Sequence, residues 1–270
     1  YLRTEKQALA AVGEMARVLK PGGKLATVLN NEHCKAAAGT AMDDKFCQPP
    51  SWWIDVASKL GLGNVQVFRE VEGIYGTAEL WQRGRDVGRY TIIAEKAKGD
   101  KSVATFQTYH CPPVTPAQAQ AKANNSFLVM YKKYNRDAAE RFKRGEMAPH
   151  DCSGMGGSYG LTSTEYGYFA LTLAGRMGIK DGDSVFEAGM GCGAFHFFLK
   201  KGYPNVRAFG SDFTEPMLQV ARLALPSDGP FCEADLGNLS FVAGNSMDHV
   251  VSVGAMEYLQ TEKQAFAAVG

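Results

Sequence analysis

A glycine-rich loop gives the second half of the chain its clearest chemistry. Three of five consecutive residues are glycines, Gly189, Gly191 and Gly193, and they follow an apolar run that contains Glu187. Glycine has no Cβ, so such a loop turns sharply and lets a ligand approach its backbone. A loop of this kind between a strand and a helix predicts a nucleotide-binding site.

Carboxylates follow the loop at the ends of the expected strands. Asp212 lies nineteen residues beyond the last of these glycines, where a carboxylate can accept hydrogen bonds from a ribose diol. Asp235 comes at the end of a third strand, and Asp248 opens a fourth. Two alternatives stay open here, because Asp212 also suits a helix cap and Met217, in the helix that follows, suits the hydrophobic core.

The loop alone does not select one nucleotide. Gly189, Gly191 and Ala194 also satisfy the G-x-G-x-x-A pattern of enzymes that use nicotinamide or flavin cofactors. On the loop alone, a redox enzyme therefore remains an alternative.

The order of the motifs resembles that of class I S-adenosylmethionine-dependent methyltransferases. The similar segments are Glu187-x-Gly-x-Gly-x-Gly, the stretch from Gly210 to Leu218, Glu233-Ala-Asp235-Leu236 and Asp248-His-Val-Val-Ser252. The run from Ala16 to Leu25, ARVLKPGGKL, is similar to the turn before the fifth strand of this family.

The resemblance implies S-adenosylmethionine as the cofactor and a role for each motif. Glu187 and the glycine loop would hold the methionine part, and Asp212 would bind the ribose hydroxyls. Asp235 would accept from the adenine amino group, with Leu236 and Met217 on the two sides of the base. Carboxylates accept from hydroxyl and amino donors, so these roles are chemically reasonable.

The elements that must position these residues alternate between strands and helices. In the second half we expect helices at 164–178 and 215–225, and strands at 184–188, 206–212, 231–236 and 246–254. In the first half we expect helices at 4–20 and 52–60, and strands at 24–29, 65–71 and 90–96. By the resemblance, these strands form the doubly wound, seven-stranded, mostly parallel sheet of the Rossmann-like α/β class, with an antiparallel hairpin at one edge.

The first thirteen residues of the chain recur at its end. Tyr1–Gly13 and Tyr258–Gly270 differ only at Arg3/Gln260 and Leu9/Phe266. The offset of 257 residues matches one methyltransferase domain, which predicts a tandem repeat of such domains. Circular permutation of a single domain and duplication of an unrelated helix are the alternatives.

This repeat divides the chain into three parts. Residues 1–97 would be the C-terminal half of one methyltransferase domain, and residues 160–270 the N-terminal, cofactor-binding half of the next domain or of the same, permuted one. Residues 98–159 would be a linker with covering helices: 111–116 extended, 117–144 charged and helical, and 155–160 a flexible loop. Whether the two halves meet within one chain or across repeats stays open.

The composition of the chain limits which classes of binding partner we expect. A net charge of +1 and the absence of a long apolar run predict no binding to nucleic acid and no membrane span. The six cysteines show no CxxC pair, so we expect reduced thiols, a cytoplasmic location and no metal site.

Methyl transfer requires mainly that an acceptor be held in line, so catalytic residues can be few. We expect candidates where the fourth and fifth strands end: Glu257, Tyr258 and His33. His33 also suits a solvated loop, and Trp52 and Trp53 suit either acceptor stacking or the core. The predicted function is methylation of a small-molecule acceptor by a protein that is a repeat array. Its expected partners are neighbouring repeats of the same protein or further copies in a homopolymer. The alternative is a structural, filament-forming array with little activity.

Overall fold

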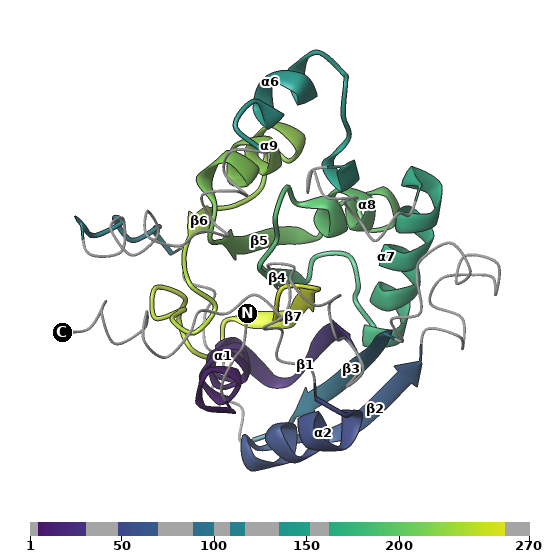
Figure 1. Ribbon diagram of the computed structural model, residues 1–270. Coiled ribbons are helices and arrows are strands. Elements are labelled where there is room, and N and C mark those ends of the chain that lie inside the picture. Colours follow the sequence, from purple (N-terminus) through teal and green to yellow (C-terminus); the bar gives the residue numbers. More distant parts are fainter. Residues whose placement is uncertain are drawn as a thin grey trace, which may run out of the picture.

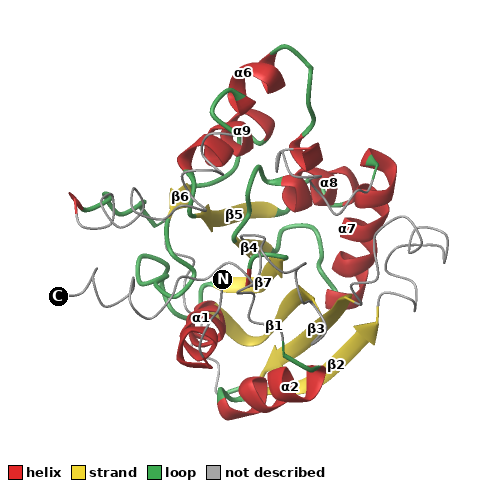
Figure 2. Cartoon of the chain, in the orientation of Figure 1, coloured by secondary structure: helices red, strands yellow, loops and turns green. Residues whose placement is uncertain are grey.

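The computed structural model describes residues 5–30, 48–69, 89–99, 109–116, 135–151 and 162–256. Within these residues one seven-stranded sheet has the order β2-β3-β1-β7-β4-β5-β6 (Figures 1 and 2). Its strands are β1 (Leu19–Asn30), β2 (Leu62–Arg69), β3 (Arg89–Lys96), β4 (Ser184–Ala188), β5 (Arg207–Asp212), β6 (Phe231–Glu233) and β7 (Met247–Val253). Only β3 runs against its neighbours, so the predicted mostly parallel α/β sheet with an antiparallel edge is confirmed.

Both halves of the chain contribute to this sheet. The first half supplies β1, β2 and β3, and the second half supplies the other four strands. They join where β1 pairs in parallel with β7, Lys24 opposite His249 and Val28 opposite Val253. Figure 1 shows this joint as the purple β1 beside the yellow β7. In this chain the two halves therefore build one sheet.

Helices cover both faces of the sheet (Figure 2). One hydrophobic cluster joins a face of the sheet to α1 (Glu5–Val18) and α2 (Pro50–Lys59), and a second joins the other face to α7 (Ser163–Met177) and α8 (Ala194–Gly202). The apolar positions of α1 are spaced as an amphipathic helix requires, and its fully buried side chains include Ala8, Ala11 and Met15. The first half is thus held by core packing as well as by strand pairing.

Local signals set the limits of α7 close to the predicted ones. The Thr162 hydroxyl accepts from Glu165 N, and the Glu165 carboxylate accepts from Thr162 N, which forms a capping box. Gly178 ends the helix in the left-handed conformation, with φ of 71°. This helix leads directly into the turn before β4.

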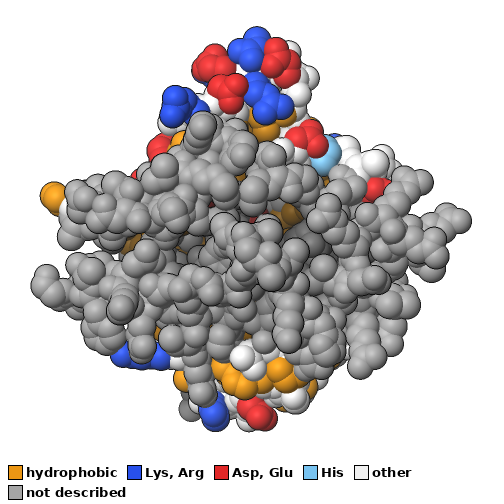
Figure 3. All heavy atoms as spheres, viewed as in Figure 1, with side chains coloured by type: hydrophobic (Ala, Val, Ile, Leu, Met, Phe, Trp, Pro, Cys, Tyr) orange, Lys and Arg blue, Asp and Glu red, His pale blue; other side chains and the backbone are white. Residues whose placement is uncertain are grey.

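The linker region is described only in part. It includes the short helix α6 (Ala138–Lys143) and a 3-10 turn at Pro149–Asp151. Residues 117–134 of the predicted charged helices and the predicted loop at 155–160 lie outside the described residues. Exposed charges of both signs gather over α6 (Figure 3), including the Lys143–Glu140 and Arg144–Glu146 ion pairs. No described helix combines the length and apolar character that a membrane span needs.

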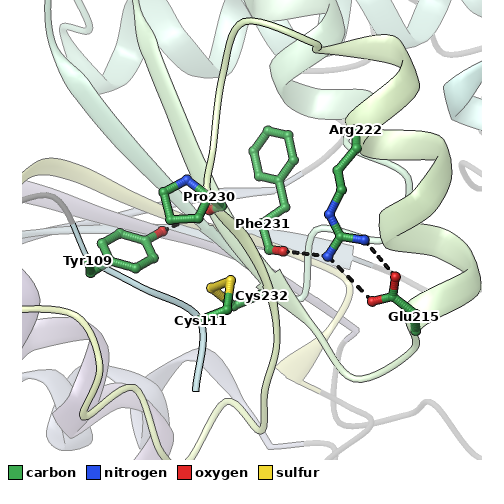
Figure 4. The surroundings of a disulfide bond; sticks show 7 residues. All are labelled: Tyr109, Cys111, Glu215, Arg222, Pro230, Phe231 and Cys232. Atoms are coloured by element: carbon green, nitrogen blue, oxygen red, sulfur yellow. Dashed lines mark hydrogen bonds and ion pairs between the residues drawn. A yellow bond between two sulfur atoms is a disulfide. The ribbon is translucent and has the colours of Figure 1, made fainter. Parts of the chain in front are cut away.

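The expectation of reduced thiols is wrong. Cys111 of the linker forms a disulfide with Cys232 of β6 (Figure 4), and Cys192 is also disulfide-bonded. Two residues before Cys111, Tyr109 is buried against Phe186 and its hydroxyl donates to Pro230 O at 3.1 Å. Spacing along the sequence could not reveal a pairing across 121 residues. The inference of a cytoplasmic location loses the support that it drew from reduced thiols.

Candidate functional site

The predicted cofactor residues gather at one edge of the sheet. Strands β4, β5, β6 and β7 are parallel, so their carboxyl ends meet at the same edge. The glycine loop follows β4, Asp212 ends β5, and Asp235 lies two residues beyond β6. The structure thus brings together motifs that are up to 48 residues apart in the sequence.

The glycine loop adopts a conformation that needs its glycines. Gly189, Gly191 and Gly193 all have positive φ, at 75°, 54° and 73°. The amides of Gly189 and Met190 both donate to Ser211 O, at 2.8 and 2.9 Å, which fixes the loop against the end of β5. Gly193 is the N-cap of α8, so the loop leads straight into a helix N-terminus.

Side chains from two other elements lie against this loop. A Cβ built on Gly191 would be 3.3 Å from Met217 Cε of α9 (Glu215–Ala224), and one on Gly189 would be 3.7 Å from Leu236 Cδ1. On Gly189 it would also collide with Ala255, just after β7. Met217 and Leu236 therefore border the loop, although Met217 also packs in a small core cluster with Val220.

Asp212 ties the end of β5 to the loop. Its Oδ2 accepts from Gly191 N at 2.9 Å, and its Oδ1 accepts from the backbone and hydroxyl of Thr214 at 2.9 and 2.7 Å. Burial raises the pKa of Asp212, and these hydrogen bonds act against the rise. Thr214, not Asp212, is the N-cap of α9, so the cap alternative does not describe the role of Asp212.

Glu187 is a buried carboxylate beneath the loop. Only 3% of the residue is exposed, and among the described residues its Oε2 has no hydrogen-bond partner. Burial is the main cause that raises the pKa of Glu187 well above its usual range, and the nearby Asp212 carboxylate adds to it. An unpartnered buried carboxylate is costly, and it marks a place where a ligand group can bind.

Sequence reasoning missed His196 of α8, which lies beside Glu187. Its Nε2 donates to Phe209 O at 2.9 Å and is 3.8 Å from Glu187 Oε2, too far for a hydrogen bond. Burial lowers the pKa of His196 to about 4, so the ring is neutral near pH 7 and does not neutralise the carboxylate. A histidine inside the apolar run Phe195–Leu199 was the available signal.

The remaining acidic motifs have different surroundings. Asp235 is partly exposed, and its Oδ1 accepts from Gly237 N at 2.7 Å. Asp248 lies at the start of β7, at the opposite edge of the sheet, where it pairs with Lys20 and accepts from Ser184 N. Asp248 is thus a structural residue, whereas Asp235 lies at the edge that carries the loop.

Among the described residues, the carboxylates of the site have no neighbouring protein cation. Within the part of the chain that the structure describes, neither Glu187 nor Asp212 forms an ion pair with Lys or Arg. Two carboxylates beside a loop that exposes backbone favour a ligand with positive charge and hydroxyl or amino donors.

The predicted acceptor-side residues His33, Glu257 and Tyr258 lie outside the described residues, so their roles stay predictions. Trp53 is buried in the core beneath α2, and Trp52 packs against it edge to face with ring centroids 4.8 Å apart. For this tryptophan pair the structure supports the core alternative.

Comparison with known proteins places residues 185–269 in the family model described as "Methyltransferase domain". A search of curated proteins found no significant match. Among solved structures, one that is similar is a Methanococcus maripaludis protein with an unproven assignment as an S-adenosyl-L-methionine-dependent methyltransferase. The two sequences are 20% identical, the TM-score is 0.36, and the match covers 51% of this chain and 57% of that one.

Two further solved structures share the resemblance. One is an amino pentose methyltransferase from Micromonospora echinaspora, with 22% identity, a TM-score of 0.31 and coverage of 49% of this chain and 48% of that one. The other is phosphoethanolamine N-methyltransferase 2 from Haemonchus contortus, with 16% identity, a TM-score of 0.34 and coverage of 94% and 51%. The chain spans about half the length of these proteins, and at these TM-scores no activity is carried over from them. The family model covers 85 of the 270 residues, and the sheet order is consistent with the α/β fold of class I methyltransferases.

Proposed function

We propose that this chain is a class I methyltransferase domain, which binds S-adenosylmethionine at the glycine loop and transfers its methyl group to a small-molecule acceptor. The observation that carries the proposal is the buried Glu187 carboxylate, whose Oε2 has no hydrogen-bond partner within the described part of the chain. It directly precedes the glycine loop, in which Gly191 N donates to Asp212. S-adenosylmethionine carries a sulfonium, an ammonium and a ribose diol, which supply the positive charge and the hydrogen-bond donors that these carboxylates can accept.

Electrostatics favours this ligand over a nicotinamide dinucleotide. The pyrophosphate of a dinucleotide is anionic and would lie at the glycine loop, next to the carboxylates of Glu187 and Asp212. Like charges in a buried site repel strongly. A cationic ligand would instead stabilise the ionised form of both carboxylates.

Each predicted residue has a role that its surroundings allow. Glu187 and the loop amides would hold the methionine part, and Asp212 would accept from the ribose hydroxyls with the lone pairs that its protein hydrogen bonds leave. Asp235, partly exposed, would accept from the adenine amino group. Met217 and Leu236 border the loop on the side where the base would lie.

The bound cofactor supplies an electrophilic methyl group, whose bond to sulfur breaks as the acceptor forms its own bond to carbon. The chain's task is to hold the acceptor in line and to exclude water. We propose that Glu257, Tyr258 and His33 act there, because β7 and β1 are neighbours and these residues follow their carboxyl ends. Variants at these positions should keep cofactor binding and lose methyl transfer.

We also propose that this domain is one unit of a tandem array. The support is the recurrence of Tyr1–Gly13 at Tyr258–Gly270, with eleven of thirteen residues identical. The alternative is a structural, filament-forming array of inactive domains. A measurement of cofactor binding distinguishes the two.

The deciding experiment is calorimetric titration of the protein with S-adenosylmethionine, S-adenosylhomocysteine and NAD⁺. We expect saturable binding of the first two and none of NAD⁺, with binding lost in Asp212→Ala. Asp55→Ala is the matched control, because Asp55 is exposed on α2, away from the loop. Failure of the folded wild-type protein to bind S-adenosylmethionine would overturn the proposal and favour the structural array.

A further inference from the structure

The joint between the two halves of the chain is an extensive interface of its own. Residues 5–96 come first in the sequence but would be the C-terminal half of a methyltransferase domain, so we call them the back half. Residues 162–256 are the front half, and the contact between the two halves is the seam. The seam includes the parallel ladder from Lys24 to Val28 on β1 and from His249 to Val253 on β7. The backbone alone therefore aligns the halves over five residue pairs.

Polar side chains extend the seam beyond the ladder. Arg17 donates to Val242 O and Leu239 O at 2.9 and 2.8 Å, and Glu14 Oε2 accepts from Leu239 N at 2.9 Å. Lys96 Nζ donates to Asn245 Oδ1 at 2.9 Å. Three of these four contacts come from the C-terminal turns of α1, and the fourth comes from the end of β3.

Residues 258–270, shortly after β7, repeat the sequence of residues 1–13, which include the first nine residues of α1. Only residues 254–257 separate β7 from the copy at 258–270. The described buried positions of α1 in the repeated stretch are Ala8, Ala11 and Val12, and all three are identical in the copy, as Ala265, Ala268 and Val269. Of the two differences, the one on a described side chain falls at Leu9, which is only partly buried.

The place of α1 beside β7 can therefore be reached by two covalent routes. One route is the α1 of the back half, and the other is the copy that follows β7 itself. The α1 of the back half continues to Val18 and makes the Glu14 and Arg17 contacts described above.

We infer that the seam is an exchange interface: residues 258–270 compete with α1 for its place, and a displaced back half completes the front half of a second copy of this chain. This inference deepens the proposed repeat and does not depend on methyl transfer. It commits to a second copy as the partner, because only the same sequence reproduces the ladder and the polar contacts of the seam.

The connection between the halves has the length that exchange requires. Residues 97–108 join β3 to Tyr109, and twelve residues reach roughly 40 Å when extended. Beyond them, the Cys111–Cys232 disulfide and the buried Tyr109 hold the linker on the front half (Figure 4). The back half can thus leave its own front half while the end of the linker stays in place.

Cysteine pairs across the seam test the exchange. Thr27 and Ser252 face each other in the ladder and both are buried. Neither hydroxyl has a hydrogen-bond partner among the residues that the structure describes, so cysteine replaces them conservatively. Thr27→Cys chains and size-tagged Ser252→Cys chains are co-expressed, oxidised and separated on a non-reducing gel. We expect a mixed covalent dimer, which forms only if β1 of one chain lies beside β7 of the other.

The double variant Thr27→Cys/Ser252→Cys is the folding control, because an intrachain crosslink shows that the seam has formed. A crosslinked double variant together with no mixed dimer at any protein concentration would overturn the inference. Light scattering of the wild-type protein gives an independent measure, with dimers expected beside the 29.2 kDa monomer.

A matched pair of variants tests the role of the copy. Ala268 corresponds to the buried Ala11, and Ala267 corresponds to the exposed Ala10. A charge at the buried position cannot occupy the place of α1, so Ala268→Glu should reduce the mixed dimer to less than about half, whereas Ala267→Glu should leave it unchanged. Equal yields in the two variants would show that the copy does not compete with α1. Because no readout involves cofactor, failure here and failure of S-adenosylmethionine binding are separate results.

Discussion

Lys20 Nζ lies 2.7 Å from Asp248 Oδ1, and this ion pair joins residues that are 228 positions apart in the sequence. Asp248 Oδ2 also accepts from Ser184 N at 2.9 Å, so a single carboxylate connects β1, β7 and β4. Hydrogen bonding to Lys20 and Ser184 outweighs desolvation and lowers the pKa of Asp248 below its ordinary value.

Replacing Asp248 should therefore weaken the fold in a pH-dependent way. We expect Asp248→Ala to lower the free energy of unfolding by about 1–3 kcal/mol at pH 7, and Asp248→Asn by less, because an amide oxygen can still accept from Ser184 N. Since the folded pKa lies below the unfolded one, the carboxylate stabilises the fold above about pH 4, and this contribution is lost as the pH falls through the lowered pKa. Urea titrations at pH 7 and pH 3 measure both effects; a wild-type advantage that persists undiminished at pH 3 would contradict the assignment.

Glu187→Gln should stabilise the ligand-free protein and abolish cofactor binding. Burial raises the pKa of Glu187, so the folded state binds more protons than the unfolded state above about pH 4.5, and wild-type stability falls as the pH rises. The amide has no charge to desolvate, so we expect roughly 1–3 kcal/mol of added stability at pH 7 to 8 and little difference at pH 4. Thermal unfolding across this pH range, paired with calorimetry, measures the trade-off. A variant that is no more stable than the wild type at pH 8 would show that Glu187 is not strained by its burial.

Gly189→Ala should damage both the loop and its ligand. The residue has φ of 75°, which costs an L side chain about 1–2 kcal/mol, and the new Cβ would collide with Ala255. We expect at least about tenfold weaker binding of S-adenosylhomocysteine by calorimetry, equivalent to about 1.4 kcal/mol. The matched control is Gly175→Ala, because Gly175 is exposed in α7 with open space around it, and there alanine should stabilise by about 0.5–1 kcal/mol. Equal effects at the two sites would argue against a special loop conformation.

Cys111→Ser should destabilise the protein without moving the glycine loop. The lost disulfide closes a segment of 121 residues, and crosslinks of this kind contribute about 2–4 kcal/mol. Denaturant unfolding under oxidising conditions measures the cost. A thiol reductant should then have a smaller effect on Cys111→Ser than on the wild type, with the remainder due to the bond at Cys192. If reductant lowers the stability of both proteins equally, the Cys111–Cys232 bond is not formed in solution.

Local chemistry made much of this fold predictable. Three glycines after an apolar run indicated the β4–α8 loop, and a Ser/Thr start and a terminal glycine indicated α7, because each signal acts within a few residues. The cofactor residues stay predictions that the family resemblance supplied; what the strand ends indicated is that Glu187, Asp212 and Asp235 lie near one another, because the carboxyl ends of parallel strands meet at one edge. These relations needed no knowledge of which strands are neighbours.

Other features depend on contacts that no local pattern encodes. The partner of Lys20 and the bond between Cys111 and Cys232 arise only when the chain is folded, since more than a hundred residues separate each pair. His196 was missed because its hydrogen bond to Phe209 O is made across the layer between α8 and β5. Helix α1 ended earlier than expected because β1 begins at Leu19, where pairing with Met247 competes with continued helix.

The place of β1 in the sheet has a consequence for synthesis on the ribosome. β1 is made before its parallel partner β7, which begins only at Met247, so more than two hundred residues must be added between them before this sheet can close. Until then β1 presents an unpaired edge, the kind of surface that recruits other strands and promotes aggregation. Contacts of such long sequence separation also slow folding, because the entropy of closing the loop is lost before the pairing stabilises it. Nascent chains of this protein should therefore depend on chaperones until β7 has left the ribosome.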